Sequence, residues 1–577
     1  MRGMNPGLWA LWGLCVIAAA PAIGLAQQDS ARARQTLPAE IRRDVVDRWN
    51  GPNVVRGIGR VEIDSGREVM GNVAVSGGPL IIAGHVTGSV LGLNADVTLR
   101  PTARIDGELL VVGGIVEGRA VARVAGPVRV YHEPLAYRVE ADRIVAIADS
   151  ARESESWWRR LERRRDGNRT EVLRVVEAGP YNRVEGLPIG LGPVMHRLAP
   201  WGSFDVEAAA VVRTGTAFNS SQGDVGHKLR GELRFGSDRG AGIGARMFNV
   251  VDPIESWQLT NLETALAAFL VRRDYRDYYQ RHGSTGYVTL YGAPNLSLTG
   301  SYGAERWSSR VVRNPFTLFR SDDPWRPNPA VDEGVFHLAD VALSWDTRTD
   351  PLDPWSGWLI NADLEHGRGS IDVPAPSSDP RSVGRTGLTT YTRGFLDVRR
   401  YNRLGPGAQF NMRVVLGGWL NGDGLPLERR LSVDGPGVLP GFDFRAVRGG
   451  RDVGTCSSGT GAPGVAAECE RIAVGQIEYR RDLHVGLTSN LEDYLRQYLS
   501  AHGGIAWVLF ADAGRGWLLG AKDGGLSYGN GELPPLSTFR SDLGLGLDLA
   551  GIGVYAAKSV STPSEPVNFF VRLRHRF

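Results

Sequence analysis

The segment NFFVRLRHRF, residues 568–577, alternates between two kinds of side chain. Successive side chains of a β-strand point to opposite faces, so this segment predicts a strand whose two faces differ in chemistry. One face suits lipid and the other a water-filled interior, as in the wall of a membrane barrel. We expect the lipid face to hold Phe569, Val571, Leu573, His575 and Phe577, and the interior face to hold Phe570, Arg572, Arg574 and Arg576.

Alternating segments of this kind recur from Tyr181 onward, separated by clusters of Gly, Pro, Asn and Asp. Examples are FDVEAAAVVRTG from Phe204, GYVTLYGAPNLSLTGSYG from Gly286 and GIAWVLFADAG from Gly504. About ten residues with a period of two is the length that a tilted strand needs to cross a bilayer. The sequence therefore predicts an all-β protein in which residues 181–577 form an antiparallel transmembrane β-barrel of about 16 strands.

Composition excludes several other classes of protein. The chain has 577 residues, 75 of them glycine, and 22% are charged, which favours several all-β domains. A net charge of +3 is too small to indicate nucleic-acid binding. Ten scattered histidines lack metal-ligand spacing, and the GLSYG pattern at 525–529 lacks the strand and helix that a catalytic serine requires. We expect no enzyme activity, metal or cofactor.

The first 26 residues have the pattern of a signal peptide. A cationic start at Arg2 precedes an apolar run from Leu8 to Ile23 and small residues up to Ala26. An uncleaved anchor helix is the alternative, although the run is shorter than the roughly 20 residues that span a bilayer. Beyond this segment no window of about 18 apolar residues occurs, so a multi-helix membrane protein is excluded. Residues 27–53 are predicted to be a flexible or weakly helical leader.

Residues 54–140 repeat short β-branched segments, each headed by a glycine. Gly71, Gly88 and Gly107 begin GNVAVSGG, GSVLGLNAD and GELLVVGG. This spacing suits one coil of a β-solenoid built from three short strands. The region resembles the bactofilin-like, polymer-forming domains, and the resemblance implies a stacked β-helix. A small β-sandwich is the alternative.

Residues 141–180 are predicted to be a helical linker. They contain Trp157, Trp158 and the basic run RRLERRR at 159–165. Such a run can contact acidic lipid headgroups, or it can be the solvated face of a helix. A linker between two domains fits both interpretations.

Three segments of the predicted barrel resemble the BamA/TamA-like bacterial surface antigen family. They are DTRTDPLDPWSGWLINADLE from Asp346, RLSVDGPGVLPGFDFRAV from Arg430, and the series of strands that closes at Phe577. In the first, Asp346 and Arg348 can pair at a strand end, the prolines force a turn, and Gly357 lets the chain re-enter a strand at Trp358.

The second segment is similar to the family loop that folds back into the barrel. In the family an Arg precedes the Gly-aromatic pair of this loop and meets acidic groups on the wall, but here that position is Pro440. We hypothesise that Arg445 supplies the missing cation, with unrelated charges as the alternative. The resemblance places the latch at Gly441, Phe442, Asp443 and Arg445, and the wall acids at Glu478 and Asp512.

Two cysteines, Cys456 and Cys469, lie in the Gly/Ser/Ala-rich stretch TCSSGTGAPGVAAEC, which is typical of a long exposed loop. In an oxidising compartment they are expected to form a disulfide that closes a loop of about 14 residues. A metal site is the sharper alternative, but no histidine accompanies them. The remaining cysteine, Cys15, is expected to leave with the signal peptide.

The family resemblance implies a bacterial outer-membrane protein with its N-terminal region in the periplasm, and an aromatic terminal residue, Phe577, that marks the barrel for assembly. Its implied function is outer-membrane protein assembly or polypeptide translocation. The expected partners are outer-membrane lipid and lipopolysaccharide, with client polypeptides or a periplasmic partner as further possibilities and no nucleic acid. The alternatives are a structural anchor for the solenoid and a passive pore, since the family's periplasmic βααββ modules are missing from the N-terminal sequence.

Overall fold

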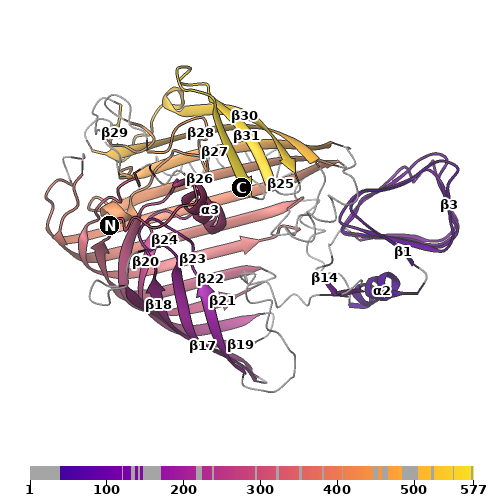
Figure 1. The fold of residues 1–577 in the computed structure, drawn as a ribbon, viewed down its shortest axis with the longest axis horizontal. Helices are drawn as coiled ribbons and strands as arrows, with labels where there is room; N and C mark the ends of the chain where they lie inside the picture. The colour runs from indigo at the N-terminus through magenta and orange to yellow at the C-terminus, as the bar shows by residue number, and fades with distance from the viewer. Residues whose placement is uncertain are drawn as a thin grey trace.

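The computed structural model describes two β-rich parts of the chain, a solenoid and a barrel (Figure 1). It describes residues 39–577 apart from 53, 120, 132–134, 136, 141–142, 147–170, 200, 216–223, 237–238, 293–294, 320–321, 323, 350–353, 378, 380–381, 406, 446–451, 458–465, 484–504, 521–524, 550–551 and 574–575. The predicted signal peptide and the basic run at 159–165 lie outside the described residues.

Thirteen short strands build the solenoid in three parallel sheets, with orders β1-β4-β7-β10-β13, β11-β8-β5-β2 and β12-β9-β6-β3. Each strand pairs with the equivalent strand of the next coil. The strands are β1 (Val54–Ile58), β2 (Val61–Ile63), β3 (Glu68–Val69), β4 (Asn72–Ser76), β5 (Leu80–Ile82), β6 (His85–Val86), β7 (Val90–Leu93), β8 (Val97–Leu99), β9 (Arg104–Ile105), β10 (Leu109–Val112), β11 (Val116–Glu117), β12 (Arg123–Val124) and β13 (Val128–Tyr131).

The repeating glycines mark the places where successive coils touch. A Cβ on Gly88 would lie 2.4 Å from the backbone of Gly71, and one on Gly107 would lie 2.6 Å from Gly88. Only glycine fits such close backbone approach. Valine, leucine and isoleucine side chains fill the space inside the coils. The predicted three-strand coil is confirmed.

A helix and a hairpin cover one outer face of the solenoid. Helix α2 (Ala39–Asn50) buries Val45 and Trp49 against the first sheet, beside the hairpin of β14 (Tyr137–Glu140) and β15 (Arg143–Ala146). Arg48 of α2 also pairs with Glu108, next to β10, at 2.8 Å. The leader predicted over residues 27–53 therefore contains a packed helix, because its apolar positions match an exposed solenoid face.

The second part is one large sheet that curves into a barrel (Figure 1). Its strands are β16 (Glu171–Ala178), β17 (Pro188–Ala199), β18 (Gly202–Arg213), β19 (Val225–Phe235), β20 (Gly240–Pro253), β21 (Tyr278–Tyr291), β22 (Leu296–Ser309), β23 (Glu333–Asp346), β24 (Gly357–Val373), β25 (Gly387–Gly405), β26 (Ala408–Gly422), β27 (Arg471–Leu483), β28 (Ile505–Leu519), β29 (Ser527–Tyr528), β30 (Arg540–Leu549), β31 (Ile552–Ser559) and β32 (Asn568–Leu573). Three short helices lie in its connections, α3 (Asn261–Val271), η4 (Leu427–Arg429) and η5 (Leu536–Thr538).

Of the 17 strands, the two-residue β29 pairs parallel to β28, and the other 16 form a continuous antiparallel series from β16 to β32. The predicted fold class and strand number are therefore confirmed. The first strand begins at Glu171 rather than after Tyr181, within the range predicted as a helical linker. The helical prediction for residues 141–180 is wrong where the structure describes them, because residues 143–146 form β15 and residues 171–178 form β16. Residues 147–170 lie outside the described part.

The two faces of the barrel wall differ as the period of two predicts. In β30 the side chains of Leu543, Leu545 and Leu547 are 46–61% exposed on the outside, whereas those of Asp542 and Asp548 are buried inside. Such a wall is apolar outside and polar inside, the reverse of a water-soluble protein. Among the described residues, no helix is long and apolar enough to span a bilayer.

The last strand follows the expected pattern only as far as Leu573. Phe569 and Val571 are 77% and 58% exposed, and Arg572 is buried on the inner side. Phe577, expected on the lipid face, is instead buried, and its carbonyl accepts a hydrogen bond of 2.6 Å from the Tyr401 hydroxyl. This expectation is wrong because β32 ends at Leu573, so the alternation does not reach residue 577. Residues 574 and 575 lie outside the described part.

Candidate functional site

The connection between β26 and β27, residues 423–470, folds into the barrel. Its described residues are mostly buried, and Val433, Val438, Leu439 and Phe442 pack with apolar residues of the wall strands. These two strands are the eleventh and twelfth of the 16-strand series. We call this connection the inward loop.

The tip of the inward loop, Val438 to Gly441, lies against the closing strands. Gln476 of β27 donates a hydrogen bond to the Val438 carbonyl at 3.0 Å. Asn568 of β32 donates to the Pro440 carbonyl at 3.2 Å. The Gly441 N–H donates to Asp542 of β30 at 2.7 Å. Three strands near the end of the series therefore hold one short segment of backbone.

Glycine is required at position 441 by the closeness of the wall. A Cβ there would lie 2.6 Å from the Cβ of Asp542 and 2.8 Å from the backbone nitrogen of Ser559. Real side chains do not approach so closely. The predicted Gly-aromatic pair thus marks the point where the loop backbone meets the wall, with Phe442 buried beside it and the Asp542 carboxylate as the acceptor.

An acidic pair stands beside this tip. Asp512 of β28 and Asp542 of β30 are cross-strand partners, and both are buried. The Arg576 side chain forms an ion pair with Asp512, and its guanidinium lies 3.6 Å from the centre of the Phe510 ring. The cation at the predicted wall acid is therefore supplied by the segment that follows β32.

Arg445 does not fill this position, so the hypothesis that it replaces the missing latch cation is wrong. Its guanidinium lies 3.1 Å from Glu255 and 3.2 Å from Asp277, which flank α3 in the connection between β20 and β21. Its backbone has a φ of 55° and its N–H donates to Asp434 at 2.6 Å. The ion-pair partners of Arg445 are thus Glu255, Asp277 and Asp434 rather than Asp512.

The electrostatics of Arg445 follow from these neighbours. Burial alone lowers the pKa of a guanidinium, but the carboxylates of Asp434, Asp277 and Glu255 outweigh it and raise the pKa of Arg445 above its usual value. Arg445 therefore stays charged and joins the inward loop to the connection that carries α3.

The other predicted residues of this group have further partners, and Arg576 interacts electrostatically with Glu478 as well as with Asp512, so both predicted wall acids lie near this cation. Glu478 of β27 is buried and accepts a hydrogen bond from Asn411 at 3.4 Å, with Arg480 at 3.6 Å. Phe442 lies beneath the guanidinium of Arg540, which is 4.8 Å from the ring centre. Asp443 is exposed.

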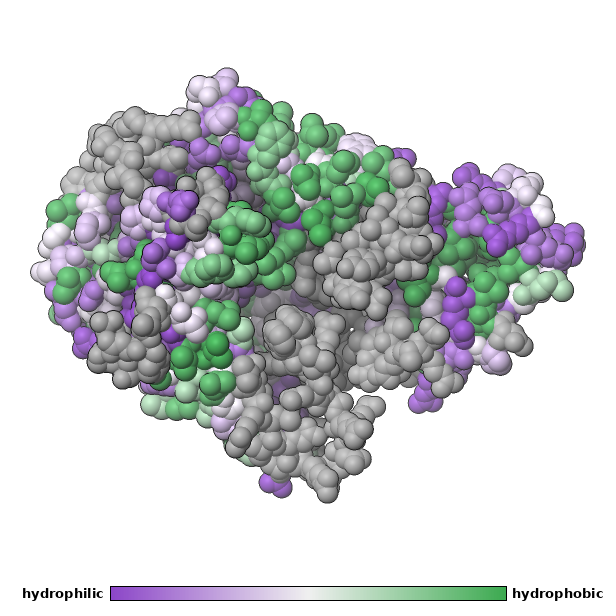
Figure 2. Space-filling model, viewed as in Figure 1, coloured by the Kyte–Doolittle hydropathy of each residue, from purple (hydrophilic) through white to green (hydrophobic). Residues whose placement is uncertain are grey.

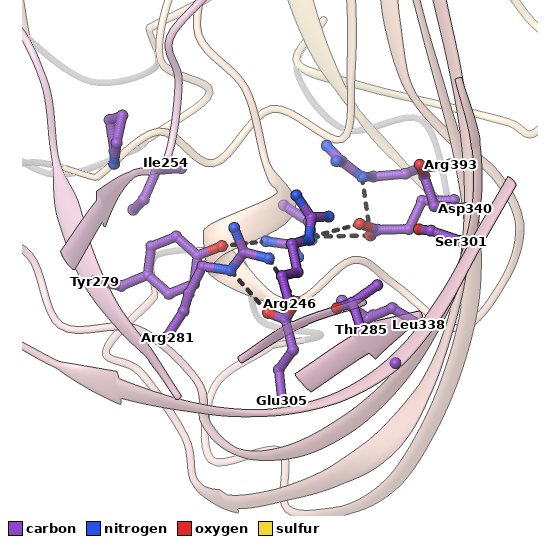
Figure 3. A pocket seen from close by; sticks show the side chains of 14 residues that line it. Arg246, Ile254, Tyr279, Arg281, Thr285, Ser301, Glu305, Leu338, Asp340 and Arg393 are labelled. Atoms are coloured by element: carbon purple, nitrogen blue, oxygen red, sulfur yellow. Dashed lines mark hydrogen bonds and ion pairs between the residues drawn. The ribbon is translucent and has the colours of Figure 1, made fainter. Parts of the chain in front are cut away.

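A second anchor joins the inward loop to β21 and β24. Arg429 donates hydrogen bonds to Glu365 of β24 at 2.8 Å and to the Tyr279 hydroxyl of β21 at 2.7 Å. It lines a polar cavity of about 240 Å³, where Arg281 pairs with Glu305 and Arg393 with Glu365 (Figure 3). The loop is thus tied to the wall on both sides of the lumen.

The predicted hairpin motif lies between β23 and β24. Arg348 contacts Asp346 through two side-chain hydrogen bonds of 2.9 and 2.8 Å. Gly357 has a φ of 113°, and a Cβ there would lie 2.3 Å from the Thr347 carbonyl. The Trp358 N–H donates to the Thr347 hydroxyl at 2.9 Å. This is the strand-end pairing and glycine turn that the sequence indicates.

Cys456 and Cys469 form a disulfide within the inward loop. Both are buried, and a Cβ on Gly516 of β28 would lie 2.1 Å from the Cys469 sulfur. The stretch was expected to be an exposed loop, but its described ends pack against the barrel wall.

Comparison with known proteins gives structural likeness only. No family model matches the chain, and no curated protein matches it. Among solved structures, BamA from Haemophilus ducreyi lacking POTRA domains 1-3 is 11% identical, with a TM-score of 0.41 over 70% of this chain and 69% of that one. CdiB from Acinetobacter baumannii and CdiB from Escherichia coli are 10% and 11% identical, with TM-scores of 0.30. They cover 70% and 77% of this chain and 59% and 68% of theirs.

The sequence did not identify Asp542 or Glu255 as residues of this site. It also did not identify Asp512 as the partner of Arg576. Asp542 lies in FRSDLGLGLDL, where alternation places it on the same face as the acids inside the barrel. Arg576 was placed on the interior face, but the alternation does not say which acid it pairs with. No local pattern carries that information.

Proposed function

We propose that this chain is a barrel of the bacterial outer membrane that assembles membrane proteins or translocates polypeptides. The membrane placement is supported by the wall chemistry of β30 and β32, with leucine, valine and phenylalanine outside and aspartate and arginine inside. Closed or covered strands are the form in which a β-sheet can cross lipid without helices.

The observation that carries the functional proposal concerns the two end strands of the sheet. In the described part of the chain, β16 pairs only with β17 and β32 pairs only with β31. A strand edge without a partner strand offers N–H and C=O groups to an incoming extended polypeptide. The inward loop holds the strands beside this seam through Gly441 and the acidic pair that Arg576 also binds, so it can set the seam's geometry.

The direct test is depletion of the protein in its parent bacterium. We expect lower folded amounts of other outer-membrane barrels, measured by quantitative proteomics and heat-modifiable migration of the barrels. Complementation with the native chain restores them, and the variant Gly441→Ala restores less. Unchanged levels of all other barrels would contradict an assembly or translocation function.

The second candidate function is a membrane anchor for a periplasmic partner. At the first coil of the solenoid, Val55, Ile58 and Met70 are 52%, 47% and 76% exposed, which is a chemistry suited to another protein. In this case depletion would leave other barrels unchanged and release one periplasmic protein from the outer-membrane fraction.

A further inference from the structure

Helix α3 lies at the seam between the two ends of the barrel sheet. Its Glu263 side chain bonds to Arg572 of β32 at 2.6 Å, and Glu263 also accepts the backbone N–H of Leu573 at 3.0 Å. Toward the other end of the sheet, Phe269 packs edge-on against Tyr181, which follows β16, with ring centres 5.3 Å apart. Figure 1 shows α3 between the last strands and the purple strands that begin the sheet.

The bond from the Leu573 N–H to Glu263 replaces a hydrogen bond that a neighbouring strand would otherwise accept. A strand in the wall needs a carbonyl from a neighbouring strand for each outward N–H, and in lipid an unsatisfied N–H costs several kcal/mol. Glu263 takes the place of that carbonyl for Leu573. Helix α3 therefore covers the edge of β32 at Leu573, where β32 pairs with no strand other than β31 in the described part.

The side chains of α3 are arranged in reverse of a helix in water. Glu263, Thr264 and Ala268 are buried, whereas Leu262 and Leu266 are 54% and 37% exposed. A helix of a water-soluble protein buries its leucines and exposes its glutamate. This inversion matches the barrel wall, in which the outer surface is apolar.

The apolar face of α3 is continuous with other exposed apolar residues. The Leu318 N–H donates to the Phe269 carbonyl and the Phe319 N–H to the Leu270 carbonyl, both at 2.9 Å. Leu318 and Phe319 are 50% and 57% exposed. Figure 2 shows hydrophobic surface over the last strands and over the adjoining position of α3.

We propose that α3 is a lipid-facing part of the barrel wall. It covers the seam between β16 and β32 at the Leu573 end of β32, with Leu262 and Leu266 against the acyl chains of the bilayer, and the rest of the β32 edge has no partner strand in the described part. Glu263 holds it to β32, and Phe269 holds it to the β16–β17 connection. This inference rests on the membrane placement proposed above.

The test uses spin labels on the full chain in phosphatidylcholine vesicles. The variant Leu266→Cys is labelled and compared with Phe569→Cys on the lipid face of β32 and with Leu536→Cys, which is 82% exposed in the β28–β30 connection. Power saturation measures collision with oxygen, which enriches in lipid, and with a water-soluble nickel chelate. We expect Leu266→Cys to match Phe569→Cys within about twofold in the ratio of the two accessibilities.

Each outcome decides a separate question. If Leu266→Cys behaves like Leu536→Cys while Phe569→Cys stays in lipid, α3 faces water and the inference is wrong. If Phe569→Cys is also accessible to the nickel chelate, the membrane placement itself fails. Heat-modifiable migration selects folded variants, and Leu262→Cys serves as a second position if Leu266→Cys does not fold.

A second measurement tests the attachment to β32. Adding Glu263→Ala to the labelled Leu266→Cys variant should narrow the spectral lines, because the helix loses its bonds to Arg572 and Leu573. Glu532→Ala, which removes an exposed carboxylate in the β28–β30 connection, is the matched control and should leave the lines unchanged. Equal spectra for both variants would show that Glu263 does not hold α3.

Discussion

The ion pair between Arg576 and Asp512 joins the segment after the last strand to the thirteenth strand of the series across the barrel interior. Both side chains are buried, and Asp512 lies directly opposite Asp542 in the sheet. Because Asp542 accepts the Gly441 N–H, the same acidic pair binds the loop tip and the chain's last segment. One small cluster thus fixes two segments that are far apart in the sequence.

Replacing Arg576 should therefore destabilise the barrel. Arg576→Gln leaves a buried Asp512 carboxylate without its cation, which costs roughly 3–5 kcal/mol. The expected result is a lower temperature at which the folded, faster-migrating band disappears in detergent. Arg368→Gln, at an exposed arginine of β24, is the control and should leave this temperature unchanged.

The coupling of the pair can be measured in the double variant. Asp512→Asn together with Arg576→Gln should be more stable than Arg576→Gln alone, since no uncompensated charge remains. If the two single effects simply add, Arg576 and Asp512 do not act as a pair.

Gly441→Ala should displace the tip of the inward loop, because its Cβ would overlap Asp542 and Ser559. We expect a loss of roughly 1–3 kcal/mol in stability, as for other overpacked sites, and faster cleavage of the loop by an added protease. Gly475→Ala in β27 is the matched control, since nothing lies within 4 Å of a Cβ there. Equal protease resistance of the two variants would show that the tip is not held at residue 441.

Removing the disulfide should weaken the inward loop without preventing barrel formation. The double variant Cys456→Ser, Cys469→Ser loses a cross-link worth roughly 3 kcal/mol in the chain-entropy model. The thermal transition of the folded band should fall by several degrees. Reductant added to the folded native protein should have little effect, because both sulfurs are buried. A variant with an unchanged transition would indicate that the wall contacts alone order the loop.

We also expect the stability of the protein to depend on pH through Glu428, a buried residue of η4 in the inward loop. Burial, and next the neighbouring Asp332 carboxylate, raise the pKa of Glu428 to about 8. In the unfolded chain the same carboxyl loses its proton near pH 4.5. Between these values the folded protein binds more protons, so its stability should fall as pH rises, by at most about 1.4 kcal/mol per pH unit.

Glu428→Gln removes this titration and should flatten the curve between about pH 4.5 and 8. The measurement is the thermal transition of the folded band at several pH values. A native protein whose transition rises over the same interval would contradict a protonated Glu428 in the folded state.

The wall and the solenoid follow from the sequence because each rests on a short period. Leu543, Leu545 and Leu547 alternate with inward residues, and Gly71, Gly88 and Gly107 recur once per coil. Local periodicity determines such elements almost independently of the rest of the chain. The strand-end pairing of Asp346 with Arg348 is equally local.

The interior contacts could not be predicted in the same way. The sequence marks Arg445 and Arg576 as cations of the interior, but it does not give their partners. Arg445 pairs with Glu255 and Asp277, and Arg576 pairs with Asp512. Which arginine meets which carboxylate depends on the three-dimensional course of both segments. The outward-facing leucines of α3 could not be predicted either, because its sequence looks like an ordinary short apolar segment.

The glycines that touch between coils also limit how the length of the solenoid can change. Each coil fits the next through backbone contact at Gly71, Gly88 and Gly107, so the stack lengthens by adding whole coils, while the turns within a coil can differ in length, as the spacings of 17 and 19 residues show. Each such event changes the length of the solenoid by one strand spacing, about 4.8 Å. The length of the solenoid therefore changes in fixed steps, and the solenoids of related chains should differ by whole numbers of coils.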